Sequence, residues 1–289
     1  MTARGRLDTA LVARGIARSR TQAQALVRDG RVQVDGIVAT KVSQPVAADQ
    51  QISVAVGRPG GESDWIAAGW VGRGALKLEH ALAQWAPEGL SVAGRRCLDV
   101  GASTGGFTQV LLRRGAAHVV ALDVGHGQLD PVLASHPDVT DLPGTNIRAT
   151  TAETIGGTVD VVVGDVSFIS VAHVLRVLPT LLSTDSDSDP DVVLLIKPQF
   201  EIGARRLGHD GVVRSPDQRQ EVLRSVLSTV REVGLAPFGV LRSPVRGGAA
   251  GNIEYLVWAR PCRPGMMDWG LSPQDEAAAC AQLRTEEET

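Results

Sequence analysis

The sequence predicts an α/β protein with a doubly wound, mostly parallel Rossmann-like sheet, preceded by a small α+β domain. Segments with strand character alternate with segments of helical period, which is the order of a parallel sheet with crossover helices. One strand leads directly into a glycine-rich turn and a helix start, at residues 98–112. With 289 residues, the chain is long enough for one full α/β domain and a smaller second domain.

Short apolar runs are the strand candidates of the larger domain, and longer segments of helical period lie between them. The expected strands are 98–100, 118–122, 159–163, 192–196, 238–241 and 253–258, and the expected helices include 172–182 and 217–233.

The first forty residues predict a module of two short helices and a hairpin. Apolar residues with helical spacing begin at Leu7 and end before Gly15. Ser19, with a glutamine three residues later, is a capping box that begins a second helix. Asp35 and Gly36 lie between two short alternating runs and predict a hairpin turn.

Charge is distributed unevenly along the chain. The net charge is −3, but residues 1–60 contain nine Arg or Lys against four acids, so this segment carries +5 and the rest −8. A small basic module is typical of a polyanion binder. We expect RNA contacts from its cationic side chains: Arg4, Arg6, Arg18, Arg20, Arg28, Arg31 and Lys41.

The run LDVGASTGGFTQVLL, residues 98–112, is the candidate cofactor loop. Its spacing G-x-x-x-G-G differs from the G-x-G-x-x-G of dinucleotide sites, and it lacks the lysine of a phosphate-binding loop. Glycines alone would fit an ordinary tight turn, but Asp99 precedes them and Asp123 ends the next strand, where a carboxylate can bind ribose hydroxyls. S-adenosylmethionine fits, because it has a ribose, an adenine and an amino-acid end but no phosphate.

We therefore expect the cofactor site to comprise the glycine-rich turn, the two acids and one asparagine. The candidates are Asp99, Gly101, Ala102, Ser103, Thr104, Gly105, Gly106, Phe107, Asp123 and Asn146.

Four charged residues stand near the expected sheet edge. Asp165 and Lys197 follow strand candidates, Glu254 lies in NIEYLVW, and Lys77 precedes the first core strand. Each alone is compatible with an exposed lysine or a helix cap. Together they are candidates for a site, because ligands of doubly wound sheets bind at the carboxyl ends of strands.

The chain resembles the TlyA family of ribosomal RNA 2′-O-methyltransferases, also called hemolysin-A-like proteins. The motifs that carry the resemblance are VGRGALKLEHAL, LDVGASTGGFTQVLL, ALDVGHGQLD, GDVSFIS, IKPQFE, GHDGVVR and SPVRGGAAGNIEYLVWAR, and residues 6–36 are similar to the S4 RNA-binding domain. The resemblance implies an FtsJ-like methyltransferase domain and places Lys77, Asp165, Lys197 and Glu254 on a K-D-K-E tetrad. It also points to cytidines of ribosomal RNA as the target.

The chemistry that this resemblance implies needs a base, since a ribose 2′-hydroxyl is a poor nucleophile. Lys197 is the candidate. A lysine with an ordinary pKa of about 10.4 stays protonated at neutral pH, so we expect partial burial and a second cation such as Lys77 to lower it. Asp165 and Glu254 would orient the ammonium groups and the hydroxyl. We expect no metal and, because only RNA carries the 2′-hydroxyl, no DNA substrate.

The expected domains are an RNA-binding domain at 1–60, a linker at 61–64, a catalytic domain at 65–262 and an acidic, flexible tail at 263–289. Three scattered cysteines, with no paired spacing, favour a reducing, cytoplasmic compartment. No apolar run approaches the length of a membrane span, so no membrane association is expected.

Two other functional classes compete with the methyltransferase interpretation. One is an S4-domain RNA-binding protein without methyltransferase activity, such as a pseudouridine synthase or an inactive methyltransferase fold that serves as a scaffold. A pseudouridine synthase would not need the glycine-rich turn or Asp123. A membrane-active hemolysin would need an apolar or strongly amphipathic segment.

Overall fold

The computed structural model describes residues 5–17, 19–55, 64–184, 189–203, 206–247, 251–262 and 270–288. The chain divides into two compact units, an N-terminal unit of residues 1–75 and a C-terminal unit of residues 76–289. Within the linker expected at 61–64, only Asp64 belongs to the described residues, and it begins a helix. The expected domain limits stay predictions.

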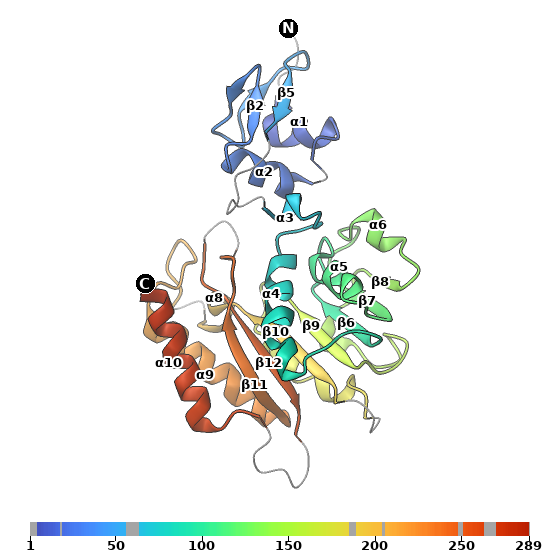
Figure 1. Cartoon of the computed structure of the whole chain (residues 1–289), viewed down its shortest axis with the longest axis vertical. Coiled ribbons are helices and arrows are strands. Elements are labelled where there is room, and N and C mark those ends of the chain that lie inside the picture. Colours follow the sequence, from blue (N-terminus) through green and yellow to red (C-terminus); the bar gives the residue numbers. More distant parts are fainter. Residues whose placement is uncertain are drawn as a thin grey trace. The chain divides into compact units, whose positions relative to one another are not determined.

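The N-terminal unit contains short helices and small antiparallel sheets (Figure 1). Strand β2 pairs with both β3 and β5, and β1 pairs with β4. Leu7, Leu11, Leu26 and Val32 are buried in its core. The elements are β1 (Gly5–Arg6), α1 (Leu7–Ala13), α2 (Arg20–Arg28), β2 (Val32–Val34), β3 (Ile37–Val38), β4 (Pro45–Val46), β5 (Ile52–Val54) and α3 (Asp64–Ala67).

The cap and the turn expected in this unit are confirmed. Ser19 Oγ accepts a hydrogen bond from the Gln22 N–H at 3.2 Å and caps α2. Asp35 and Gly36 have φ angles of 50° and 80° and connect β2 to β3. A two-residue hairpin turn of type I′ requires positive φ at both central positions.

The described strands of the C-terminal unit form one seven-stranded sheet in the order β11-β12-β10-β9-β6-β7-β8. Its strands are β6 (Arg96–Val100), β7 (His118–Leu122), β8 (Val139–Leu142), β9 (Val161–Gly164), β10 (Asp191–Ile196), β11 (Leu235–Arg242) and β12 (Tyr255–Pro261). Neighbours from β10 to β8 are parallel, whereas β12 runs antiparallel to β10 and β11. The expected α/β architecture is confirmed.

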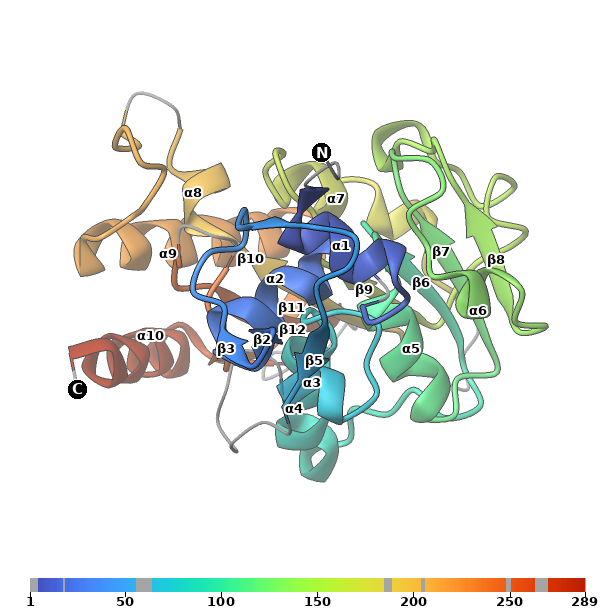
Figure 2. The same cartoon turned by 90° about the horizontal axis from the view of Figure 1, so that it is seen from above.

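Helices cover both faces of this sheet. Figure 2 shows α7 and α9 on one side of the strands and α4 and α5 on the other. The helices are α4 (Ala75–Trp85), α5 (Gly106–Arg113), α6 (Pro131–Ala134), α7 (Ala172–Leu175), α8 (Pro198–Glu201), α9 (Pro216–Glu232) and α10 (Pro273–Glu288), with 3₁₀ turns η1 (Ala86–Glu88), η2 (Ile147–Ala149) and η3 (Leu178–Thr180).

Burial on both faces explains why the strands read as continuous apolar runs. Val192, Leu194 and Ile196 of β10 belong to the core that includes residues of α7 and α9. Trp258 of β12 meets Trp85 of α4, with ring centroids 5.8 Å apart.

Two expectations about local structure were wrong. The expected helix 172–182 is a short α7 followed by η3, with Pro179 at the start of the 3₁₀ turn. The expected flexible tail contains helix α10. Cys280 and Leu283 are buried in the core, and Gln220 Nε2 donates a hydrogen bond of 2.7 Å to the Cys280 carbonyl, so packing against α9 outweighs the acidic composition.

Among the helices that the structure describes, none has both the length and the apolar character needed to cross a membrane.

A buried acid anchors the start of β10, at the opposite end of the strand from Lys197. The Asp191 carboxylate accepts hydrogen bonds from Arg95 Nη1 at 2.5 Å, Trp258 Nε1 at 2.7 Å and Arg260 Nε at 2.7 Å. The three donors come from β12 and from the residue preceding β6. Asp191 therefore links β10 to two other parts of the sheet.

We expect Asp191→Ala to lower the free energy of unfolding by about 3–5 kcal/mol, because it leaves two largely buried guanidinium groups without their shared partner. Urea denaturation measures the loss. Glu221→Ala is the control, since the ion pair of Glu221 with Arg206 is exposed and its removal should have a much smaller effect. Equal losses in the two variants would contradict the anchoring role.

Candidate active site

The topology brings charged residues from distant parts of the sequence to one edge of the sheet. Asp165 directly follows β9 and Lys197 directly follows β10. Glu254 directly precedes β12, and because β12 is antiparallel, the pairing of Tyr255 with Ile196 places Glu254 at the same edge. Lys77 reaches this edge from α4.

The four side chains form a continuous chain of ion pairs. Lys77 Nζ lies 2.7 Å from Glu254 Oε2 and 3.2 Å from Asp165 Oδ2. Lys197 Nζ lies 2.5 Å from Asp165 Oδ1. The Asp165 carboxylate therefore stands between the two ammonium groups, and the structure brings together all four residues singled out in the sequence.

Burial and charge together define the state of this cluster. Lys77, Lys197 and Glu254 are buried. Burial opposes the charge of Lys77, but the carboxylates of Asp165 and Glu254 outweigh it and raise the pKa of Lys77. Burial likewise disfavours the Asp165 carboxylate, yet the ammonium groups of Lys77 and Lys197 lower its pKa. We expected Lys77 to act on Lys197 as a second cation, but two carboxylates compensate the charge of Lys77.

A glycine makes room for Glu254. A Cβ atom on Gly247 would lie 1.8 Å from Glu254 Oε1. Gly247 also pairs with Asn252 in an isolated β-bridge, and the Asn252 side chain accepts a hydrogen bond from the Val213 N–H at 2.9 Å. A side chain at position 247 would therefore displace the Glu254 carboxylate.

A cavity of about 370 Å³ lies beside the cluster. It opens over the ends of β6, β7 and β9, where the predicted cofactor loop lies. Four of the predicted cofactor residues, Gly101, Ser103, Asp123 and Asn146, line it. The other lining residues are Val100, Leu122, Val124, Gln128, Ile147, Arg148, Asp165, Val166, Ser167, Phe168 and Ile169.

Asp123 organises part of the lining of this cavity. Its Oδ2 accepts a hydrogen bond from the Ser103 N–H at 2.8 Å, and its Oδ1 accepts one from the Gly125 N–H at 2.7 Å. Gly101, with φ of 81°, passes so close to the loop after β9 that a Cβ atom there would lie 2.9 Å from the Asp165 carbonyl oxygen. The glycine thus allows the candidate cofactor loop and Asp165 to meet.

The remaining predicted cofactor residues lie outside the cavity lining. Asp99 is fully buried, accepts a hydrogen bond of 2.7 Å from Thr108 Oγ1, and has its pKa raised to about 7 by burial. Phe107 is also buried, and a Cβ atom on Gly105 would clash with Leu133. These residues shape the turn from within, as do Ala102, Thr104 and Gly106, which also lie away from the lining.

The sequence analysis missed two residues of the loop after β9. Lys197 Nζ donates a hydrogen bond of 2.6 Å to Ser167 Oγ. Phe168 is 88% exposed, has a left-handed φ of 67°, and packs on Phe200 with ring centroids 5.3 Å apart. Both residues line the cavity. They follow the strand-end acid Asp165 by two and three residues, but no sequence pattern distinguishes them as part of a site.

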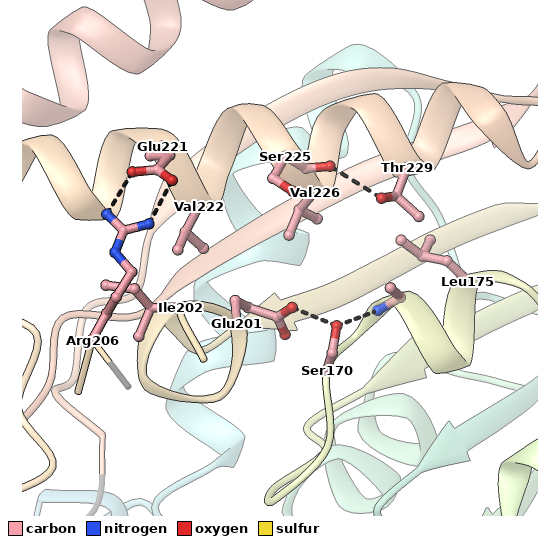
Figure 3. A pocket seen from close by; sticks show the side chains of 11 residues that line it. Ser170, Leu175, Glu201, Ile202, Arg206, Glu221, Val222, Ser225, Val226 and Thr229 are labelled. Atoms are coloured by element: carbon pink, nitrogen blue, oxygen red, sulfur yellow. Dashed lines mark hydrogen bonds and ion pairs between the residues drawn. The ribbon is translucent and has the colours of Figure 1, made fainter. Parts of the chain in front are cut away.

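Glu201 joins the loops that follow β9 and β10. Figure 3 shows its carboxylate beside Ser170, in a second cavity of about 170 Å³ bounded by α7, α8 and α9. Its two oxygens accept hydrogen bonds from Ser170 Oγ at 2.6 Å and from the Val171 N–H at 2.8 Å. Burial raises the pKa of Glu201. The segments that carry Asp165 and Lys197 are therefore held together.

The predicted RNA-binding side chains of the N-terminal unit differ in their surroundings. Arg6 and Arg20 each lie 3.0 Å from the buried carboxylate of Asp8. The Arg6 hydrogen bond, reinforced by Arg20, holds the pKa of Asp8 well below its usual range. Both guanidinium groups remain about half exposed, so they combine a structural contact with an accessible surface.

The other predicted RNA contacts are less uniform. Arg31 donates a hydrogen bond of 2.9 Å to the Ala55 carbonyl. Arg28 and Lys41 are exposed. Arg4 and Arg18 lie outside the described residues.

Within the described ranges, no group of three or more His, Cys, Asp or Glu is arranged to hold a metal ion.

Comparison with known proteins identifies two domains. The FtsJ-like methyltransferase family matches residues 70–261, and the S4 domain matches residues 5–52. TlyA of Mycobacterium tuberculosis, a 16S/23S rRNA (cytidine-2′-O)-methyltransferase, is 48% identical over 260 residues, which cover 90% of this chain and 91% of that protein. The chain belongs to the TlyA family of FtsJ-like methyltransferases.

Other members of the TlyA family carry different names. Hemolysin A of Brachyspira hyodysenteriae is 34% identical over 87% of this chain and 98% of that protein. A solved structure from Streptococcus thermophilus that bears the name hemolysin has a TM-score of 0.71 at 31% identity, and covers the whole of both chains.

Membership of the TlyA family makes S-adenosylmethionine the cofactor, and the cavity fits it. A volume of about 370 Å³ lies within the range of small-molecule sites. Gly101, Ser103 and Asp123 line the cavity, and the Ser103 N–H donates a hydrogen bond to the Asp123 carboxylate. A carboxylate and glycine backbone suit a ligand with ribose hydroxyls and no phosphate.

We expect Asp123→Ala to weaken S-adenosylmethionine binding by about 10- to 100-fold, because it removes a charged acceptor for the ribose and the partner of two loop N–H groups. Isothermal titration calorimetry measures the affinity. Asp138→Ala, which removes an exposed acid of the same unit, should leave the affinity unchanged. Unchanged affinity in Asp123→Ala would remove this residue from the site.

Proposed function

We propose that this methyltransferase transfers a methyl group from S-adenosylmethionine to the 2′-hydroxyl of a cytidine in ribosomal RNA, with Lys197 as the general base. The observation that carries the proposal is the paired cluster of Lys77, Asp165, Lys197 and Glu254 beside the cofactor cavity. The substrate follows the names of relatives, since the M. tuberculosis protein acts on cytidine in 16S and 23S ribosomal RNA.

Each residue of the cluster has a distinct task in this mechanism. Bound S-adenosylmethionine supplies a methyl group on a positively charged sulfur. Lys197 in its neutral form removes the proton of the 2′-hydroxyl, and Asp165, 2.5 Å from its Nζ, stabilises the ammonium that results. Lys77 holds Asp165 in place through an ion pair of 3.2 Å, and Glu254 in turn holds Lys77 through an ion pair of 2.7 Å.

The N-terminal unit would recruit the RNA. Its S4 domain and the positive charge of residues 1–60 support binding to ribosomal RNA or ribosomal subunits. The need for a 2′-hydroxyl argues against DNA as a substrate. Ribosomal RNA as substrate also favours action in the cytoplasm.

The two alternative functions, an RNA-binding protein without methyltransferase activity and a membrane-active hemolysin, have less support from the structure and the comparisons. An RNA-binding protein without transferase activity would have no use for a complete charged cluster beside the cavity. The hemolysin name belongs to several relatives, whereas the FtsJ-like domain that covers most of this chain supports methyl transfer.

We expect Lys197→Ala to reduce the rate of methyl transfer by about 10²- to 10⁴-fold, the usual contribution of a general base. S-adenosylmethionine affinity should be unchanged, because Lys197 does not line the described cavity. Single-turnover kinetics at saturating RNA measures the rate.

The Lys197→Arg variant distinguishes a general base from a residue that only supplies positive charge. A guanidinium does not release its proton near neutral pH, so the arginine variant should be as slow as the alanine variant. If Lys197 only contacted RNA phosphate, arginine would restore the rate and alanine would chiefly weaken RNA binding. A near-normal rate for Lys197→Arg would end the base assignment.

We expect Arg28→Glu to weaken binding to ribosomal RNA and to reduce the slope of log affinity against log salt by about 1, since one phosphate contact is lost. Filter binding over a salt series measures both. Arg224→Glu makes the same charge change on the exposed face of α9 and should have little effect. Equal effects from both variants would show a non-specific response to net charge.

A further inference from the structure

Lys197, the proposed general base, does not belong to the described lining of the cavity. The Lys197 side chain is only 10% exposed. Its Nζ contacts Asp165 and Ser167. Both of these described residues line the cavity. A hydroxyl group of a substrate placed in the cavity would therefore meet Ser167 before it met the amine.

Ser167 is well placed to connect a substrate hydroxyl with the amine of Lys197. Its Oγ lies 2.6 Å from Lys197 Nζ, and the residue is exposed on the side of the cavity. A serine hydroxyl has one proton to donate and two lone pairs, so it can bond to the lysine and to a substrate hydroxyl at the same time. Asp165, the other neighbour of Nζ, pairs with both lysines, and its lowered pKa keeps it a poor proton acceptor.

We propose that Ser167 is a further catalytic residue, whose hydroxyl relays the proton of the ribose 2′-hydroxyl to Lys197. This proposal rests on the function proposed above. As the 2′-oxygen forms its bond to the methyl carbon and the carbon–sulfur bond breaks, the 2′-proton passes to Ser167 Oγ. The Ser167 proton passes to the lone pair of neutral Lys197 Nζ. Ser167 ends unchanged, and the new ammonium is paired with Asp165.

The test compares Ser167→Ala and Ser167→Thr with the wild type in single-turnover methyl transfer at saturating RNA and cofactor. Alanine removes the relay and should lower the rate by about 10²-fold, the low end of proton-transfer effects. Threonine keeps the hydroxyl, and the exposed site has room for its methyl group, so its rate should stay within several-fold of wild type. Ser228→Ala, an exposed serine on α9, is the matched control.

A solvent isotope measurement separates a relay from a structural role. Two protons in motion give a curved dependence of the rate on the fraction of deuterium in the solvent, and Ser167→Ala should make it linear. Filter binding should show an unchanged RNA affinity for Ser167→Ala, and a saturating cofactor concentration removes any effect of this lining residue on cofactor affinity from the measured rate.

The proposal is overturned if Ser167→Ala reacts within twofold of wild type, if its loss appears only as weaker RNA binding, or if threonine is as slow as alanine. Failure of the underlying function would look different. In that case the wild type would not methylate the ribose oxygen, or Lys197→Ala would retain the wild-type rate.

Discussion

The carboxylate of Asp165 connects the charged cluster with the candidate cofactor loop in the C-terminal unit, and the rest of the site depends on it. It pairs with Lys77 and Lys197, which lie on different elements of the fold. Its backbone N–H donates to the Val100 carbonyl at 3.0 Å, and its carbonyl lies against Gly101. A displacement of this residue would therefore disturb the charged cluster and the cofactor loop together.

Much of the fold could be predicted because strong local signals agreed with the tertiary structure. Strand β7 has the expected limits, and α9 differs from the expected 217–233 by one residue at each end. Strand β8 was missed, because it is a partly exposed edge strand and its sequence VTDL lacks a continuous apolar run. Helix α10 was missed for a related reason, since few of its residues are apolar and its stability depends on contacts with α9.

The charged cluster could be predicted only in part from the residues themselves. Strand-end positions indicated Asp165 and Lys197, whereas the resemblance to the TlyA family assigned the cluster as a set. The pairing could not be read from the sequence, because it depends on the antiparallel direction of β12 and on the space left by Gly247. Ser167 was missed for a physical reason: a serine after a strand has no distinguishing pattern until its distance to a lysine is known.

The arrangement of the cluster limits which residues can act directly on a substrate. Lys77 and Glu254 are buried, and neither belongs to the described lining of the cavity. Their influence on the reaction must therefore pass through Asp165, which both supports the base and faces the cavity. Two buried cations matched by two carboxylates cost less than an unpaired charge, but such clusters seldom exceed apolar packing in stability. Their value here lies in orientation, because a base fixed by Asp165 keeps another of its hydrogen-bonding positions directed towards the hydroxyl of Ser167.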